Sequence, residues 1–177
     1  MRHRVKTSLT ILVCTLAVVA CAGETQSGWL TYESAAMRLR VNYPVAWEIV
    51  PYGPENFDIQ AVSGNGWLEI YMLEEGASNF FDLPYLAPME GEVAARGVAE
   101  AFGMTFGETE TLPTQAGEAA ALRAVDAAHD EYAYIVVLPL TGRTLIGIGW
   151  GYEQDTWEET TIPIYREIIQ SIAESEE

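Results

Sequence analysis

The sequence predicts an α+β domain in which an antiparallel sheet of about six to eight strands carries helices packed on its faces. Segments that alternate apolar and polar residues recur along the chain, and this alternation is typical of half-buried strands. Short turn sequences separate these segments. One central and one C-terminal segment instead repeat apolar residues every three or four positions, which predicts helices. Successive short strands with two helices are typical of layered α+β folds.

The first part of the domain is expected to supply four strands. The segment 37–43 alternates strictly, with Met37, Leu39, Val41 and Tyr43 on one face. Pro44 ends this strand because proline cannot donate to a ladder. The four predicted strands are residues 29–32, 37–43, 47–50 and 57–62.

A β-hairpin is predicted over residues 57–73. Ser63-Gly64-Asn65-Gly66 is the strongest turn signal in the chain, because Asn-Gly tolerates positive φ at both turn positions. Residues 67–73 then return as the second strand of the hairpin.

A helix is predicted over residues 89–104. Its apolar stripe is expected to contain Val93, Gly97 or Val98, Ala101 and Phe102, and Gly103 is expected to form its C-terminal cap. Residues 77–88 before it are irregular and contain two prolines.

Four further strands and a closing helix are predicted after residue 104. Gly147, Gly149 and Gly151 share one face of the last strand, and their lack of side chains allows a helix to pack closely there. That helix is expected to begin near Pro163, although Asp155 could cap an earlier turn. Its apolar stripe contains Ile164, Ile168 and Ile172, widened by Tyr165 and Ile169. The strands are residues 106–112, 119–127, 132–138 and 144–152, with turns at 114–117, 128–130 and 141–143.

The first twenty residues have the pattern of an export signal. Arg2, Arg4 and Lys6 precede the uncharged apolar run 7–20, whose length fits a signal sequence and is too short to span a bilayer. Val18-Val19-Ala20-Cys21 then resembles the bacterial lipobox, and this resemblance implies cleavage before Cys21 and lipidation of its sulfur. Two alternatives remain open, ordinary signal cleavage that releases a soluble product and an uncleaved anchor.

Cysteine content favours lipidation. Cys14 leaves with the signal, so the processed chain holds one cysteine and can form no internal disulfide. We therefore expect a signal at 1–20, a lipidated end and short linker at 21–28, one domain at 29–173 and an acidic tail at 174–177. The expected location is extracytoplasmic, on a bacterial membrane.

The charge of the chain limits its partners. The whole chain has a net charge of −17, and removal of the signal leaves six basic and twenty-six acidic side chains, a net charge of −20. Such a surface repels nucleic acid and anionic lipid headgroups, so no nucleic-acid partner is expected. Membrane contact is expected through the lipid at Cys21. A monomer with a possible protein partner at the membrane is expected.

The order of elements resembles the PsbP-like group, which includes an extrinsic subunit of photosystem II. The resemblance covers residues 29–173 and rests on the strand that leads into Tyr43-Pro44-Val45-Ala46-Trp47, the central hairpin, and the closing helix with Ile168-Ile169-Gln170-Ser171-Ile172. It implies an α/β/α sandwich and a non-catalytic binding or assembly role. The photosystem subunit docks largely through lysines, and the processed chain has none, so a photosynthetic function is not transferred.

Catalytic motifs are absent from the sequence. The processed chain has one histidine, no Gly-x-Ser-x-Gly sequence and no phosphate-binding glycine loop. Asp126, His129 and Asp130, with Glu131 beside them, are the one metal-like cluster, and the favoured interpretation is a solvated turn. No cofactor is expected.

The loop with Phe80, Phe81 and Tyr85 carries more apolar surface than an idle loop needs. It could contact a partner or ligand, or fold onto one face of the sheet. The leading hypothesis is an exported, lipid-anchored, non-catalytic domain that binds a partner or supports an assembly at the membrane. The alternatives are a carrier of a small apolar ligand, with a pocket between sheet and helix, and an enzyme of unknown class.

Overall fold

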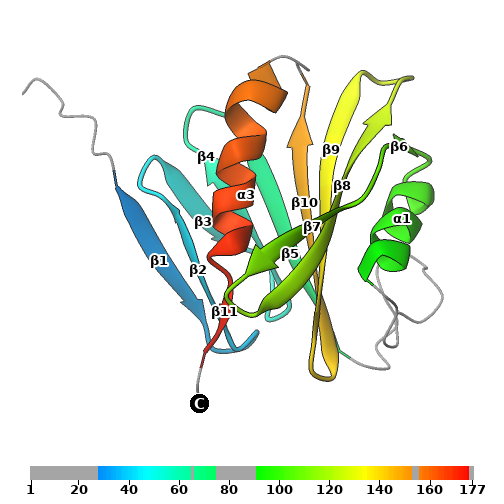
Figure 1. Cartoon of the computed structure of the whole chain (residues 1–177). Helices are drawn as coiled ribbons and strands as arrows, with labels where there is room; N and C mark the ends of the chain where they lie inside the picture. The colour runs from blue at the N-terminus through cyan, green and yellow to red at the C-terminus, as the bar shows by residue number, and fades with distance from the viewer. Residues whose placement is uncertain (1–27, 65, 75–90, 153–155, 176–177) are drawn as a thin grey trace, which may run out of the picture.

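Two antiparallel sheets and two helical segments form the domain (Figure 1). The computed structural model describes residues 28–64, 66–74, 91–152 and 156–175. The larger sheet has eight strands in the order β3-β4-β5-β10-β9-β8-β6, and β7 pairs with β8; the smaller has the order β1-β2-β11. The strands are β1 (Trp29–Ser34), β2 (Leu39–Pro44), β3 (Trp47–Pro51), β4 (Asn56–Ala61), β5 (Trp67–Glu74), β6 (Thr105–Phe106), β7 (Glu110–Thr114), β8 (Gly117–Asp126), β9 (Glu131–Leu140), β10 (Arg143–Gly151) and β11 (Ala173–Glu174).

Helices α1 (Gly91–Ala101) and α3 (Ile162–Gln170) cover opposite faces of the large sheet (Figure 1). Alternate residues of β9 separate the two cores that result. Tyr134, Val136 and Leu138 pack in the core that contains α3. Ala133, Ile135 and Val137 pack in the core that contains α1. The predicted α+β class, with a sheet of this size and helices on its faces, is confirmed.

The glycines of β10 let the C-terminal helix lie close to the sheet, as predicted. A Cβ at Gly149 would come 2.5 Å from the ring of Tyr165, and one at Gly147 would come 3.1 Å from Ile169. At Gly151 the indole of Trp157 occupies the same space. The stripe of the closing helix is also confirmed, with Ile164 at its partly buried margin.

The predicted apolar face of the central helix differs from the observed buried face by about one residue position. The buried residues of α1 are Ala94, Ala95, Val98 and Ala99, whereas Val93 is 47% exposed. Small residues form this contact because α1 lies close to alanine-rich β8 and to β9, and a Cβ at Gly91 would come 3.2 Å from Cβ of Ala120. The cap at Gly103 is confirmed: its φ is +69°, Gly103 N–H donates to Glu100 O, and Met104 N–H donates to Ala99 O.

Several predicted boundaries differ from the structure. The predicted hairpin is confirmed, but Gly66 is not one of its turn residues, because Ala61 N–H donates to Gly66 O at 2.9 Å and Gln60 pairs with Trp67. Gly66 instead accommodates Trp47, whose ring lies 2.5 Å from where a Cβ would stand. The predicted strand 106–112 is two short strands, β6 and β7.

The ends of the last helix also differ. The π-helical turn η1 (Trp157–Thr161) precedes α3, so helical structure begins before Pro163. Glu174, expected in the acidic tail, belongs to β11 and pairs with Leu39 of β2. Asp155 lies outside the described residues.

Candidate functional site

The residues predicted from the sequence to carry function fall in two groups. Cys21, Phe80, Phe81 and Tyr85 lie outside the described residues. The candidate metal residues lie in the exposed turn between β8 and β9. His129 Nδ1 is 2.6 Å from Asp126 Oδ2, whereas Asp130 accepts a hydrogen bond from the Tyr132 hydroxyl at 3.0 Å.

This β8–β9 turn is braced by its own side chains. The hydrogen bond to Asp126 raises the pKa of His129, and the same bond lowers the pKa of Asp126. Asp126 also accepts from Ala128 N–H at 2.9 Å. Among the residues that the structure describes, no three His, Cys, Asp or Glu side chains come together as metal ligands. These hydrogen bonds are those of an exposed turn, and they account for the positions of Asp126, His129 and Asp130.

A pocket of about 250 Å³ lies at one end of the large sheet, between the β4–β5 turn, the end of β10 and η1. We call it the rim pocket. Two of its aromatic residues are open to solvent, since Tyr152 is 58% exposed and Trp67 is 36% exposed. Its lining is Gly64, Gly66, Trp67, Trp150, Gly151, Tyr152, Thr156, Trp157 and Thr161.

Trp157 is the unusual member of the rim pocket. Its side chain is only 3% exposed, because the indole packs over Gly151 and lies 5.8 Å from the ring of Tyr132. Its Nε1 is buried without a hydrogen-bond partner in the described structure. A buried N–H without an acceptor costs about 1–3 kcal/mol.

Tyr165 forms hydrogen bonds with β5 and β10, the two strands that form the floor beside the rim pocket. Its hydroxyl accepts from Trp67 N–H at 2.8 Å and lies within donating distance of the carbonyl oxygens of Trp150, at 2.8 Å, and Trp67, at 3.0 Å. Burial raises the pKa of this phenol, so it stays protonated and able to donate. These hydrogen bonds tie β5 to β10 at the floor.

A second polar cluster lies on the opposite face of β4 and β5. Asp58 and Glu69 are direct cross-strand partners, and Asp58 is only 5% exposed. The Asp58 carboxylate accepts from Gln60 Nε2 and from Trp67 Nε1, both at 3.0 Å. Glu69 accepts from the Tyr71 hydroxyl at 2.9 Å. Burial raises the pKa of both carboxyl groups, and Asp58 adds to the effect on Glu69.

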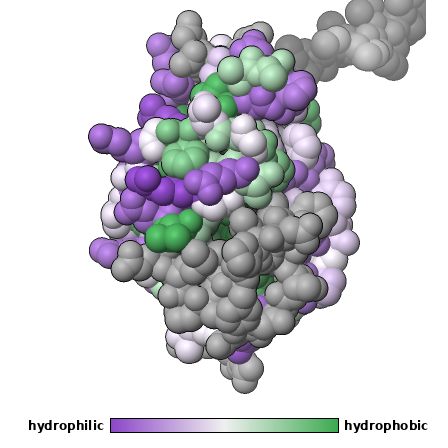
Figure 2. Space-filling view, turned by 90° about the vertical axis from the view of Figure 1, so that its right-hand side faces the viewer, coloured by the Kyte–Doolittle hydropathy of each residue, from purple (hydrophilic) through white to green (hydrophobic). Residues whose placement is uncertain are grey.

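Sequence reasoning missed both the rim pocket and this carboxylate pair. A two-residue turn at Asn65-Gly66 would have set Asp58 opposite Leu73, whereas the observed register sets it opposite Glu69. The signal for the rim pocket was the Trp-Gly-Tyr sequence at 150–152, which was interpreted only as the end of a strand. On the α1 side, the described surface mixes hydrophilic and hydrophobic side chains (Figure 2).

The rim pocket has the chemistry of a binding site. Its described lining offers two threonine hydroxyls and aromatic side chains. The lining can therefore bind a group and hydrogen-bond to it.

Comparison with known proteins shows similarity in fold alone. No protein-family model and no curated protein sequence matches this chain. The solved structure of cyanobacterial PsbP (CyanoP) from Synechocystis sp. PCC 6803 is similar, with a TM-score of 0.56 and 15% identity over 88% of this chain and 98% of that chain.

The Ran-binding protein Mog1p of Saccharomyces cerevisiae is also similar. Its TM-score is 0.52, with 10% identity over 84% of this chain and 96% of that chain. The shared features are an antiparallel sheet and helices on its two faces. The chain therefore has the PsbP-like α+β fold, which CyanoP and Mog1p also have.

Proposed function

We propose that this protein is an exported, lipid-anchored, non-catalytic domain that binds a protein partner at a bacterial membrane. The observation that carries the binding role is the rim pocket of about 250 Å³, whose lining includes Tyr152, an aromatic residue that is 58% exposed. Interfaces concentrate binding energy at such aromatic pockets.

The similar folds support a binding role. Mog1p is described as a Ran-binding protein, and CyanoP as a cyanobacterial PsbP. The membrane location rests on Val18-Val19-Ala20-Cys21, which resembles a lipobox. In the described ranges, no helix is long and apolar enough to cross a membrane.

A carrier of small apolar ligands is the second candidate. Pockets for such ligands usually hold about 300–1,000 Å³ and enclose most of the ligand. The rim pocket holds about 250 Å³. That volume suits one side chain of a partner better than a whole apolar ligand.

Replacing Cys21 with serine should release the protein from membranes. The serine hydroxyl is not a substrate for lipid attachment, and the acidic surface gives the protein no affinity for anionic headgroups. Membrane and soluble fractions are compared by immunoblot, and intact-mass analysis of the wild-type protein should show an acylated N-terminal cysteine. A serine variant that has lost its signal and still sediments with membranes as completely as wild type would contradict the lipid anchor.

Replacing Tyr152 with alanine should weaken capture of the partner at unchanged stability. The tyrosine lies at the exposed opening of the rim pocket, and truncation of an interface aromatic typically costs about 2 kcal/mol, roughly a thirtyfold loss of affinity. The full protein is solubilised from membranes in mild detergent, and captured proteins are quantified by mass spectrometry.

The matched control is Val93→Ala, because Val93 is 47% exposed on α1. A protein captured equally by wild type and by Val93→Ala, and lost with Tyr152→Ala, is the expected partner. Equal capture by all three would reject the rim pocket as the binding site. A small molecule retained by wild type in native mass spectrometry, with no captured protein, would favour the carrier.

A further inference from the structure

Three neighbouring segments at one end of the domain contain no charged residue, although the protein as a whole is acidic. We call them the neutral tip: residues 28–32, 43–47, 61–64 and 66. These segments are the start of β1, the β2–β3 turn and the β4–β5 turn, and none of them contains Asp, Glu, Lys or Arg. Figure 1 places the three at the same end of the sheets.

Backbone hydrogen bonds hold the neutral tip together. Val45 N–H donates to Gly28 O at 3.1 Å, and Val62 N–H donates to Ala46 O at 3.1 Å. The ring of Trp47 closes the gap beneath, against Gly66. The three segments therefore form one continuous surface.

Large apolar side chains on the neutral tip are exposed. Trp29 and Leu30 are each 44% exposed, and Val62 is 71% exposed. Tryptophan beside aliphatic residues is typical of surfaces that rest in the interfacial layer of a bilayer, where the indole N–H meets the headgroups and the ring meets the acyl chains.

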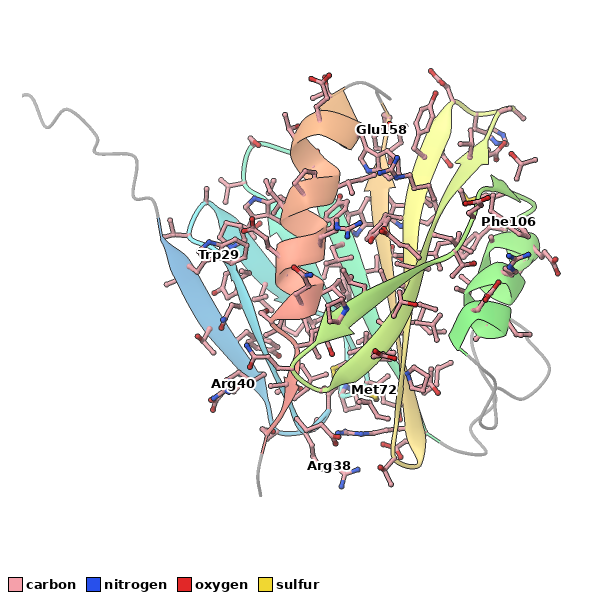
Figure 3. The ribbon with its side chains drawn as sticks, viewed as in Figure 1. Trp29, Arg38, Arg40, Met72, Phe106 and Glu158 are labelled. Carbon is pink, nitrogen blue, oxygen red and sulfur yellow. The ribbon has the colours of Figure 1, made fainter. Side chains whose placement is uncertain are left out.

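The cations of the β1–β2 hairpin lie away from this end. Trp29 stands where the described chain begins, whereas Arg38 and Arg40 lie toward the opposite end of the hairpin (Figure 3). Because the processed chain has a net charge of −20, most of its surface is repelled by anionic headgroups. The neutral tip adds no charged side chain of its own to that repulsion.

The position of Cys21 favours the same orientation. Seven residues separate Cys21 from Trp29, so at about 3.5 Å per residue the lipidated sulfur can lie no more than roughly 28 Å from the start of β1. We propose that the neutral tip rests in the interfacial layer of the bilayer that holds the Cys21 lipid, with Trp29, Leu30 and Val62 in contact with lipid. This inference rests on the proposed lipid anchor, and it adds a fixed orientation and a second, protein-mediated membrane contact.

A single introduced cysteine tests the contact. Once Cys21 is lipidated and the signal is removed, the chain has no free thiol, so Val62→Cys introduces a unique site for an environment-sensitive fluorophore. The processed, lipidated protein is reconstituted in phosphatidylcholine vesicles that contain nitroxide-labelled lipid. The matched control is Val93→Cys on α1, labelled in the same way.

The Val62 probe should be quenched at least about twofold by nitroxides near the headgroups, because an interfacial surface inserts about 5–10 Å. The fluorescence of the Val93 probe should change little in the presence of the same nitroxides. Adding Trp29→Ser and Leu30→Ser to the Val62 variant should reduce the quenching. Both positions are exposed, and circular dichroism should show that the fold is kept.

An anchored protein whose Val62 probe is as little quenched as the Val93 probe would overturn the inference and leave the lipid anchor intact. A wild-type protein whose Cys21 reacts with the fluorophore would instead reject the anchor, and the proposed orientation with it. A Val62 signal that depends on protein concentration without vesicles would assign the neutral tip to contact between two copies of this chain, which also overturns the inference.

Discussion

Replacing Gly149 with alanine should lower the free energy of unfolding by about 3 kcal/mol, because the added methyl overpacks a filled core. The new Cβ would stand 2.5 Å from two ring carbons of Tyr165 and 3.1 Å from a third. Real Cβ contacts begin well beyond that distance. Either the ring or the strand must therefore move.

Neither neighbour can move freely. The Tyr165 hydroxyl is bound to the backbone of Trp67 and Trp150, so a shift of the ring also stretches the hydrogen bonds that join β5 to β10. Trp47 packs edge-on against the same ring, with centroids 5.9 Å apart. The clash is consequently coupled to the loss of hydrogen bonds, which places the cost at the upper end of overpacking effects.

Urea unfolding of wild type and Gly149→Ala measures this cost. Gly107→Ala is the matched control, since a Cβ there meets nothing within 4 Å and the residue does not have a positive φ. The control should stay within about 0.5 kcal/mol of wild type. A Gly149→Ala protein as stable as the control would mean that α3 does not lie as close to β10 as the structure has it.

This glycine face shows what the sequence could predict. Gly147, Gly149 and Gly151 alternate along a strand, so their shared face and the close approach of a helix followed from a spacing of two residues. The α+β class, most of the strand segments and the C-terminal helix followed from periodicity in the same way. The buried face of α1 did not, because periodicity favours large apolar residues over alanine, whereas the close approach of α1 to alanine-rich β8 selects small residues.

The candidate site was harder to predict because it depends on register and on contacts across the fold. The rim pocket combines residues from the β4–β5 turn, β10 and η1, which lie up to about one hundred residues apart. Trp157 occupies the space over Gly151, and no local pattern links those two positions. The Asp58–Glu69 pair needed the correct hairpin register, and the Asn65-Gly66 sequence indicated another one.

Arg143 was predicted as a turn residue, and the structure gives it a larger part. It is the first residue of β10, its side chain is only 2% exposed, and it joins the two sheets. Its guanidinium donates to the carbonyl oxygens of Met37 and Arg38 and pairs with Glu174 of β11 at 2.9 Å. One side chain thus satisfies acceptors in the β1–β2 turn and in β11.

Replacing Arg143 with methionine should lower the free energy of unfolding by about 3 kcal/mol, because buried acceptors lose their charged donor. Arg38 adds to the cost: its φ is +47°, a left-handed conformation that a non-glycine residue adopts only when its surroundings hold it there. Chemical denaturation gives the total, and amide hydrogen exchange should show protection lost first in β1, β2 and β11.

Two further variants distinguish the contribution of the hydrogen bonds from Arg143 to backbone carbonyls from that of its ion pair with Glu174. Arg143→Lys keeps the charge but loses the planar fork, so it should recover only part of the lost stability. Glu174→Gln removes the ion pair alone, and because the Glu174 side chain is 49% exposed, this change should cost no more than about 1 kcal/mol. If Glu174→Gln lowered the free energy of unfolding as much as Arg143→Met does, the ion pair with Glu174 would be the main link between the two sheets. If lysine restored full stability, charge alone would suffice, and the carbonyls of Met37 and Arg38 would not need the guanidinium geometry.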